Sequence, residues 1–207
     1  MSRPAWPGSP PLPPANFASR PLRTTTLPVG EILYRIHRAD RGPLYFGRAK
    51  DPERRQRWDA PDGSYGVCYL AREESTAFVE TLLRDLELDA VPESELAIRS
   101  LARVRVRDPI QLAEMHGRAL RSHGADASVV QGPYPVTWEW SAAIHAHPEE
   151  PDGILCRARH DDSGFTVALF ERAADKIELL ASTGLLNPAR IHDLAIWLDR
   201  YGVGVTS

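Results

Sequence analysis

The sequence predicts a single α+β domain in which small mixed or antiparallel sheets are flanked by helices. Its 207 residues are enough for one domain with a substantial core, and no internal linker divides them. Strand-type runs and helical periodicities are both present along the chain. They do not follow the regular βαβ alternation of a doubly wound sheet, so the α+β class is favoured over α/β.

The start of the chain predicts an arm rather than a packed element. Residues 1–27 are rich in Pro, Ser and Arg and have few apolar residues in a regular period, so they bury too little surface to offset their ordering entropy. We therefore divide the chain into a flexible proline-rich arm, 1–27, and a folded catalytic-sized domain, 28–207. In that domain, residues 32–36 predict a strand, and residues 67–70 predict another after the turn signal Asp62-Gly63.

A helix is predicted from the acidic pair Glu73-Glu74 to about residue 88, because apolar residues recur at helical spacing from Val79 onward. Residues 102–106 alternate as a strand does. Residues 110–120 predict a second helix, which would begin after Pro109.

Residues 137–145 predict a third helix, with Trp138, Ala142 and Ile144 on its buried side. Three short apolar segments, 154–156, 166–170 and 177–180, are separated by turn-rich spacers and predict a small antiparallel group of strands. A last helix is predicted to open at Asn187-Pro188 and to end before Gly202. Its buried stripe would consist of Ile191, Leu194, Ala195 and Leu198.

Composition excludes several classes of function. The net charge is −3, so no basic excess predicts direct DNA binding. No apolar stretch approaches the roughly 20 residues of a membrane span, and prolines interrupt the N-terminus where a signal peptide would be apolar, so a cytoplasmic protein is expected. Cys68 and Cys156 make neither a disulfide framework nor a zinc site and are interpreted as buried thiols. No metal is expected, since no histidine belongs to a helical His/carboxylate ligand pair.

Each of four polar or aromatic side chains between residues 34 and 80 has two possible roles, one structural and one in ligand binding. Arg35 lies inside an apolar strand, so it either reaches solvent or is held over a cleft by an anion. Arg57 belongs to a basic loop, although Trp58 beside it favours a packed position. Glu80 borders the apolar stripe of its helix and either pairs with an arginine four residues on or faces a site. Tyr69 ends a strand as a core residue or as a ligand platform.

Ordered blocks of this sequence resemble the RES domain family, which takes its name from an Arg, a Glu and a Ser. The blocks are residues 33–35 (LYR), 57–63 (RWDAPDG), 65–71 (YGVCYLA), 77–80 (AFVE), 140–144 (WSAAI), 152–154 (DGI), 159–162 (RHDD) and 168–171 (ALFE). Several ordered blocks are more specific than any single short motif.

The resemblance implies a fold similar to that of ADP-ribosyltransferase toxins and an activity that consumes NAD+ as a substrate, with no further cofactor. Arg35 matches the family's Arg and Glu80 its Glu, and both are expected to be catalytic. Arg35, Arg57 and Tyr69 match residues that bind NAD+. At the family's Ser position this chain has Ala158, so one hydroxyl is missing from the substrate site, unless Ser141 or Ser163 supplies it.

The resemblance further implies a toxin that cleaves the nicotinamide–ribose bond of NAD+ and is neutralised by an Xre-like antitoxin. The resemblance leaves the acceptor of ADP-ribose open between water, phosphate and a target protein. It is also compatible with a homodimer within the toxin–antitoxin complex. The alternative is a catalytically decayed RES-fold protein that binds an antitoxin or a nucleotide. Retention of Arg35, Arg57, Tyr69 and Glu80 together argues against decay, because a cleft has no physical need to keep four polar groups without a ligand.

Overall fold

One mixed sheet of eight strands forms the centre of the computed structural model, which describes residues 10–207. The strands are β1 (Thr24–Leu27), β2 (Ile32–Arg38), β3 (Val67–Ala71), β5 (Arg99–Val106), β6 (Ile110–Met115), β7 (Gly153–Arg157), β8 (Phe165–Phe170) and β9 (Ile177–Gly184). Across the sheet they are ordered β1-β6-β7-β8-β3-β2-β5-β9. Neighbours are antiparallel except for β6 and β7, which run parallel. The α+β class predicted from the sequence is confirmed, although the strands gather into one large sheet rather than several small ones.

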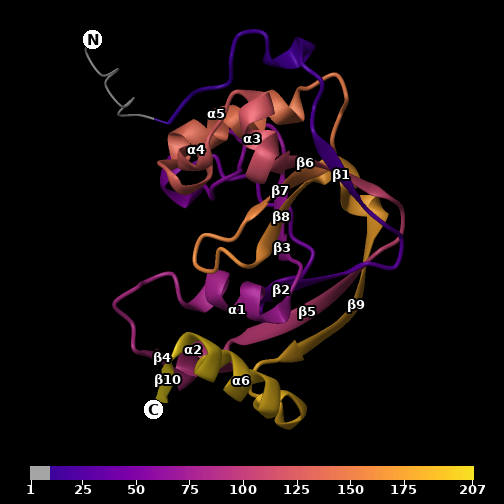
Figure 1. Ribbon diagram of the computed structural model, residues 1–207. Coiled ribbons are helices and arrows are strands. Elements are labelled where there is room, and N and C mark those ends of the chain that lie inside the picture. The colour runs from indigo at the N-terminus through magenta and orange to yellow at the C-terminus, as the bar shows by residue number, and fades with distance from the viewer. Residues whose placement is uncertain (1–9) are drawn as a thin grey trace, which may run out of the picture.

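The helices lie in two groups (Figure 1). The first contains α3 (Gly117–His123), α4 (Ala127–Gln131) and α5 (Tyr134–His145) and lies near β6 and β7. The second contains α1 (Glu74–Leu82), α2 (Glu93–Ala97) and α6 (Ile191–Tyr201) and lies toward the opposite end of the molecule. Beside α2 and α6, β4 (Ala90–Pro92) and β10 (Gly204–Thr206) form a separate parallel pair. The β7–β8 connection lies between the two groups, and the candidate site is built around it.

Part of the expected N-terminal arm is packed. Residues 1–9 lie outside the described residues. From residue 10 onward, the prediction of a flexible arm does not hold, because Phe17 and Leu22 are buried and β1 pairs with β6. Phe17 packs edge-on against Trp140 of α5, with ring centroids 5.3 Å apart. Phe17 and Leu22 join the same hydrophobic cluster but are widely spaced in the sequence, so they form no regular period and a periodicity argument does not detect them.

The helix predicted over 110–120 is wrong. Residues 110–115 form β6, and a helix begins only at Gly117. β6 lies inside the sheet between β1 and β7, where both of its faces are covered, so its buried apolar residues, Ile110, Leu112, Ala113 and Met115, form a run that does not alternate strictly. Such a run cannot be distinguished from a buried helix by periodicity alone. α1 likewise ends at Leu82 rather than near residue 88, and Leu86 is left 87% exposed.

Three further predictions concern α5, β9 and α6. α5 is confirmed, although Trp140 and Ile144, rather than Trp138 and Ala142, are its buried apolar residues. β7 and β8 pair antiparallel as expected, but β9 pairs with β5, because the 3₁₀ helix η3 (Glu171–Lys176) carries the chain away from β8. Asn187 caps a short 3₁₀ turn, η4 (Pro188–Arg190), before α6, whose buried residues are Leu194 and Trp197. The expected stripe is therefore rotated toward Trp197, which packs near Phe78 of α1.

Candidate functional site

A cavity of about 790 Å³ lies between the two helix groups and is lined from β2, β3, α1, α5, the end of β7 and the loop that follows β2. Arg35, Arg57, Tyr69 and Glu80, which the sequence singled out, all line it. Ala158 does not. It lines a second cavity of about 210 Å³, which shares Val130, Arg157 and Arg159 with the first. The strand order explains the assembly, because β3 lies between β2 and β8 and places the start of α1 beside the β7–β8 connection.

Glu80 lies near the end of α1 and is oriented by the β7–β8 connection. Its Oε1 accepts a hydrogen bond of 2.7 Å from the backbone amide of His160. The alternative ion pair with Arg84 is not formed, since Arg84 donates to the backbone carbonyl of Glu80 and to Gln56. Oε2 of Glu80 has no hydrogen-bond partner among the described residues. The carboxylate is therefore fixed through one oxygen and offers the other to the cavity.

Arg57 is held at the wall formed by the start of α5. Its Nη1 donates to the carbonyl oxygen of Gly132 at 2.9 Å, and its guanidinium lies 4.7 Å from the ring centre of Tyr134. Burial lowers the pKa of Arg57, and the charge of Arg159 lowers it further. Nη2 is buried without a hydrogen-bond partner among the residues described. An orphaned charged donor of this kind is costly, and an anionic ligand in the cavity would satisfy it.

Arg35 is half-buried and makes two contacts with its Nη1. One is with the carbonyl oxygen of Tyr45 at 3.1 Å and the other with Sγ of Cys68 at 2.8 Å. The first contact attaches the loop after β2 to the sheet, and the second uses a thiol whose pKa burial raises. The interpretation in which Arg35 simply extends into solvent is therefore wrong. Its guanidinium lines the cavity and also anchors the cavity wall.

Tyr69 presents its ring to the cavity while its hydroxyl is fully engaged. The hydroxyl donates to Asp59 Oδ1 at 2.8 Å and accepts from the amide of Trp58 at 2.9 Å. Burial and the neighbouring Asp59 carboxylate both raise the pKa of Tyr69, so the phenol stays protonated. Burial also raises the pKa of Asp59. Because the hydroxyl is committed within the protein, Tyr69 can serve a ligand only as an apolar platform.

The missing hydroxyl of residue 158 is not supplied by either expected serine. Ser141 is buried and bonded to the carbonyl oxygen of Trp58 and to the hydroxyl of Tyr65. Ser163 is bonded to Asp161. Neither lines the cavities, whereas Thr166 of β8 lines the larger one and lies 3.2 Å from Sγ of Cys156. Both cysteines are buried, as predicted.

Sequence reasoning did not assign roles to four residues of the site. Asp59 holds Tyr69, Tyr134 lies against Arg57, the amide of His160 holds Glu80, and Arg159 lines both cavities. The blocks 57–63 and 159–162 contain three of them, but no periodicity indicates which member of a loop points inward. Burial lowers the pKa of His160, while the nearby Glu80 carboxylate opposes that change.

The described residues contain neither a candidate metal site nor a candidate membrane-spanning helix. In the part of the chain that the structure describes, no group of three or more His, Cys, Asp or Glu is placed to hold a metal ion. Among residues 10–207, no helix has both the length and the apolar character that a membrane span requires.

Comparison with known proteins gives three findings. The family model described as "RES domain" matches residues 32–194. A curated protein named "Probable toxin y4kH", from Sinorhizobium fredii, is 32% identical over 95 residues, which cover 45% of this chain and 74% of that protein. The crystal structure of the M. tuberculosis MbcT–MbcA toxin–antitoxin complex contains a chain with a similar fold, at a TM-score of 0.63 and 20% identity over 83% of this chain and 92% of that chain. These findings confirm the resemblance that the sequence blocks predicted.

Proposed function

The chain belongs to the RES domain family, and from that premise we propose that it is the toxin of a toxin–antitoxin pair and cleaves the nicotinamide–ribose bond of NAD+. The observation that carries the proposal is the presence, in one cavity, of a carboxylate fixed by a backbone amide and a half-buried arginine whose buried Nη2 has no hydrogen-bond partner among the described residues. NAD+ offers both partners, a ribose that becomes positive during cleavage and a pyrophosphate that is anionic.

Glu80 is assigned the main catalytic role. As the bond to nicotinamide loosens, positive charge develops on the ribose ring, as in glycoside chemistry. A carboxylate whose position is already fixed stabilises that charge without reorganising, and this electrostatic contribution is commonly the largest in catalysis. The nicotinamide leaves from a positively charged pyridinium, so the proposal requires neither a metal nor a further cofactor.

Arg57 and Arg35 are assigned to the pyrophosphate. A guanidinium matches phosphate oxygens with two parallel donors, which a lysine cannot provide. Nη2 of Arg57 is a buried donor without a partner among the described residues, and Arg35 lines the same cavity and is held there by Tyr45 and Cys68. The ring of Tyr69 would supply a flat apolar surface for the nicotinamide or the adjoining ribose.

The decayed-site alternative, a RES-fold protein that only binds, is disfavoured by the same contacts. A decayed cavity gains nothing from keeping a half-buried carboxylate held at 2.7 Å by a backbone amide and an arginine with an orphaned donor. The acceptor of ADP-ribose is water, phosphate or a target protein. The partner is an antitoxin, for which the resemblance favours an Xre-like protein, and the complex would be cytoplasmic.

The test is incubation of the purified protein with NAD+, with and without phosphate, followed by identification of the products. Release of nicotinamide supports the proposal. ADP-ribose as the second product identifies water as the acceptor, and a phosphorylated ADP-ribose identifies phosphate. A labelled protein identifies a target side chain. Intact NAD+ after prolonged incubation with folded protein would overturn the proposal in favour of the binding protein.

A further inference from the structure

The second cavity is small and lies between α3, α4 and the β7–β8 connection. Its volume of about 210 Å³ is below the roughly 300–1,000 Å³ of sites for drug-sized ligands, so it suits one ring system rather than a whole dinucleotide. It is lined by Met115, His116, Gly117, Leu120, Ala127, Val130, Gln131, Arg157, Ala158, Arg159 and Asp162. Because Val130, Arg157 and Arg159 line both cavities, the two spaces meet at these residues.

The walls of this cavity combine apolar surfaces with a few polar edges. Met115, Leu120 and Ala158 are buried apolar residues. His116 Nε2 is buried and has no hydrogen-bond partner among the described residues. Burial lowers the pKa of His116, so at neutral pH its ring is uncharged and offers one donor and one acceptor. Apolar walls with an orphaned imidazole nitrogen fit a heteroaromatic ring, whose faces are apolar and whose edge carries hydrogen-bonding nitrogens.

Arg159 stands where the two cavities meet. Its side chain is exposed, and no hydrogen bond or ion pair engages it within residues 10–207. It is near enough to Arg57 for its charge to lower the pKa of that residue. Two guanidinium groups with free donors at a passage between two cavities favour a phosphate group at that passage.

We propose that the second cavity binds the purine base of a nucleotide whose phosphate is contacted by Arg159 at the passage between the cavities. This inference rests on the proposed function only in identifying the nucleotide as the adenosine half of NAD+. The nicotinamide half then extends toward Glu80 in the larger cavity. Gln131 and Asp162, at the rim, provide acceptors for the exocyclic amine of adenine.

The experiment measures binding by calorimetry and does not depend on cleavage. The probes are AMP, adenosine and nicotinamide mononucleotide, which has no adenine. Ala127→Phe fills the second cavity from an exposed position, and Arg118→Phe is its control on the exposed face of α3. We expect Ala127→Phe to weaken AMP binding at least tenfold and to leave nicotinamide mononucleotide unaffected, with no effect of Arg118→Phe. Arg159→Ala should weaken AMP at least fivefold and adenosine less than twofold.

Three results would overturn the inference. The first is wild-type protein that binds NAD+ but not AMP, and the second is equal AMP affinity of the Ala127→Phe and Arg118→Phe variants. The third is equal weakening of AMP and nicotinamide mononucleotide by Ala127→Phe. Gln131→Leu, at a second exposed rim position, gives an independent check that leaves the interior packing untouched, and it should weaken AMP at least twofold. If AMP binds as expected while NAD+ stays intact, the proposed cleavage fails and the base site stands.

Discussion

The backbone amide of His160 donates a hydrogen bond of 2.7 Å to Oε1 of Glu80, 80 residues away in the chain. This contact joins α1 to the β7–β8 connection at the wall of the larger cavity. An amide donor at this position orients the carboxylate and leaves its negative charge uncompensated. A lysine or arginine donor would instead neutralise that charge. The other carboxylate oxygen of Glu80 has no hydrogen-bond partner among the described residues and is therefore available to a ligand.

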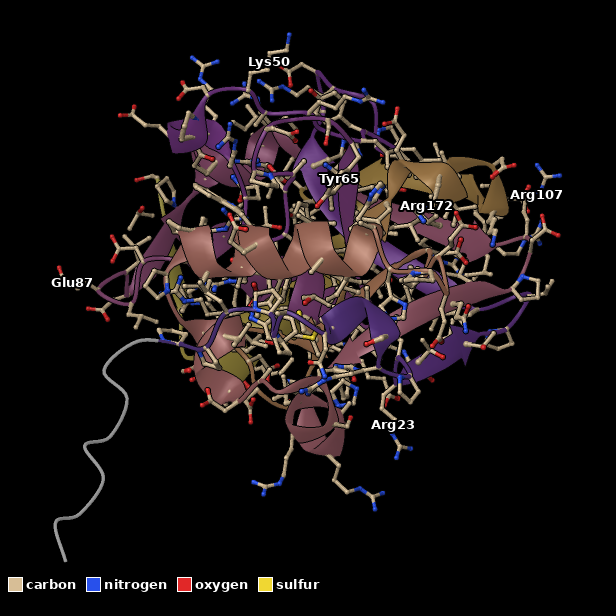
Figure 2. All side chains as sticks on the ribbon, turned by 90° about the horizontal axis from the view of Figure 1, so that it is seen from above. Arg23, Lys50, Tyr65, Glu87, Arg107 and Arg172 are labelled. Atoms are coloured by element: carbon tan, nitrogen blue, oxygen red, sulfur yellow. The ribbon has the colours of Figure 1, made fainter. Side chains whose placement is uncertain are left out.

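Glu80→Gln should keep the fold and reduce NAD+ cleavage at least 100-fold, about 2.7 kcal/mol or more at the transition state. The amide oxygen of Gln can still accept from His160, but it carries no charge to stabilise the ribose. Turnover is measured by nicotinamide release and folding by thermal denaturation. Glu87→Gln, at a carboxylate that points away from the body of the protein in Figure 2, is the control and should leave turnover unchanged. Full turnover by folded Glu80→Gln would remove Glu80 from the mechanism.

Arg57→Ala and Arg35→Ala should each weaken NAD+ binding at least tenfold, because both guanidinium groups line the larger cavity and are proposed to contact phosphate. Arg107→Ala is the matched control, since Arg107 lies outside both cavities and points away from the body of the protein in Figure 2. Binding is measured by calorimetry with the Glu80→Gln background to prevent turnover. Equal affinities of the three alanine variants would contradict the assignment.

Tyr69→Phe should lower stability more than it lowers NAD+ affinity. The change keeps the ring but leaves Asp59 Oδ1 and the amide of Trp58 without their partner, which costs roughly 1–3 kcal/mol for buried groups. Urea denaturation measures the loss, and NAD+ affinity should change less than threefold. A large affinity loss with unchanged stability would mean that the hydroxyl itself contacts the ligand.

The stability of the protein should fall as the pH is lowered from 6.5 toward 4. His123 is fully buried, its Nε2 accepts from the amide of Arg23 at 3.0 Å, and burial lowers its pKa from 6.5 to about 4. Between these values the unfolded chain binds a proton that the folded chain does not. The contribution of neutral His123 to the unfolding free energy is therefore fully present above pH 6.5. It is lost progressively as the pH falls toward 4, by roughly 3 kcal/mol in total at about 1.4 kcal/mol per pKa unit.

The variant His123→Gln tests this origin of the pH dependence, because glutamine can accept the same bond and does not titrate. Its unfolding free energy should change less between pH 7 and pH 5 than that of the wild type. His192→Gln, at an exposed histidine, should keep the wild-type pH dependence. Burial also lowers the pKa of His145 to about 4, so part of the dependence should remain in the His123 variant.

Expression of this chain alone should stop growth and lower cellular NAD+, and co-expression of the cognate antitoxin should restore both. Several arginines line the cavity, Arg35 and Arg57 among them, so an anionic group of the antitoxin would compete with NAD+ for it. Glu80→Gln should be harmless without the antitoxin. A toxic Glu80→Gln variant would show that the harm does not come from bond cleavage and would favour the binding-protein alternative.

The sequence predicts elements well where the apolar pattern matches a single periodicity, as in β3, α5 and β8. The prediction fails at β6, because both faces of this strand are covered and its residues do not alternate between apolar and polar. It also fails for the pairing of β9, whose partner β5 lies 70 or more residues earlier in the chain, as the register of Val106 with Ile177 shows. Local patterns carry no information about such pairing. The packed segment 10–27 is missed for a related reason, since its few apolar residues are placed by tertiary contacts alone.

The site was predictable to the extent that residue types and family blocks identify it. Glu80, Arg57, Arg35 and Tyr69 line one cavity, as those blocks imply. The role of each depends on neighbours that the sequence does not indicate. The hydroxyl of Tyr69 is consumed by Asp59, and the carboxylate of Glu80 is oriented by a backbone amide, which has no side-chain signature. Ala158 lies in the second cavity, so the lost hydroxyl affects a different space from the one that contains Glu80.

The pairing of β1 with β6 sets a minimum length for a soluble, folding-competent fragment. The family match begins at residue 32, whereas β1 covers Thr24–Leu27 and hydrogen-bonds to the interior strand β6. A fragment trimmed to 32–194 would expose the backbone edge of β6 beside Ile110 and Leu112, which are fully buried in the intact fold. An uncovered apolar strand edge is a template for intermolecular pairing, so such a fragment should aggregate while one that begins before Phe17 stays in solution.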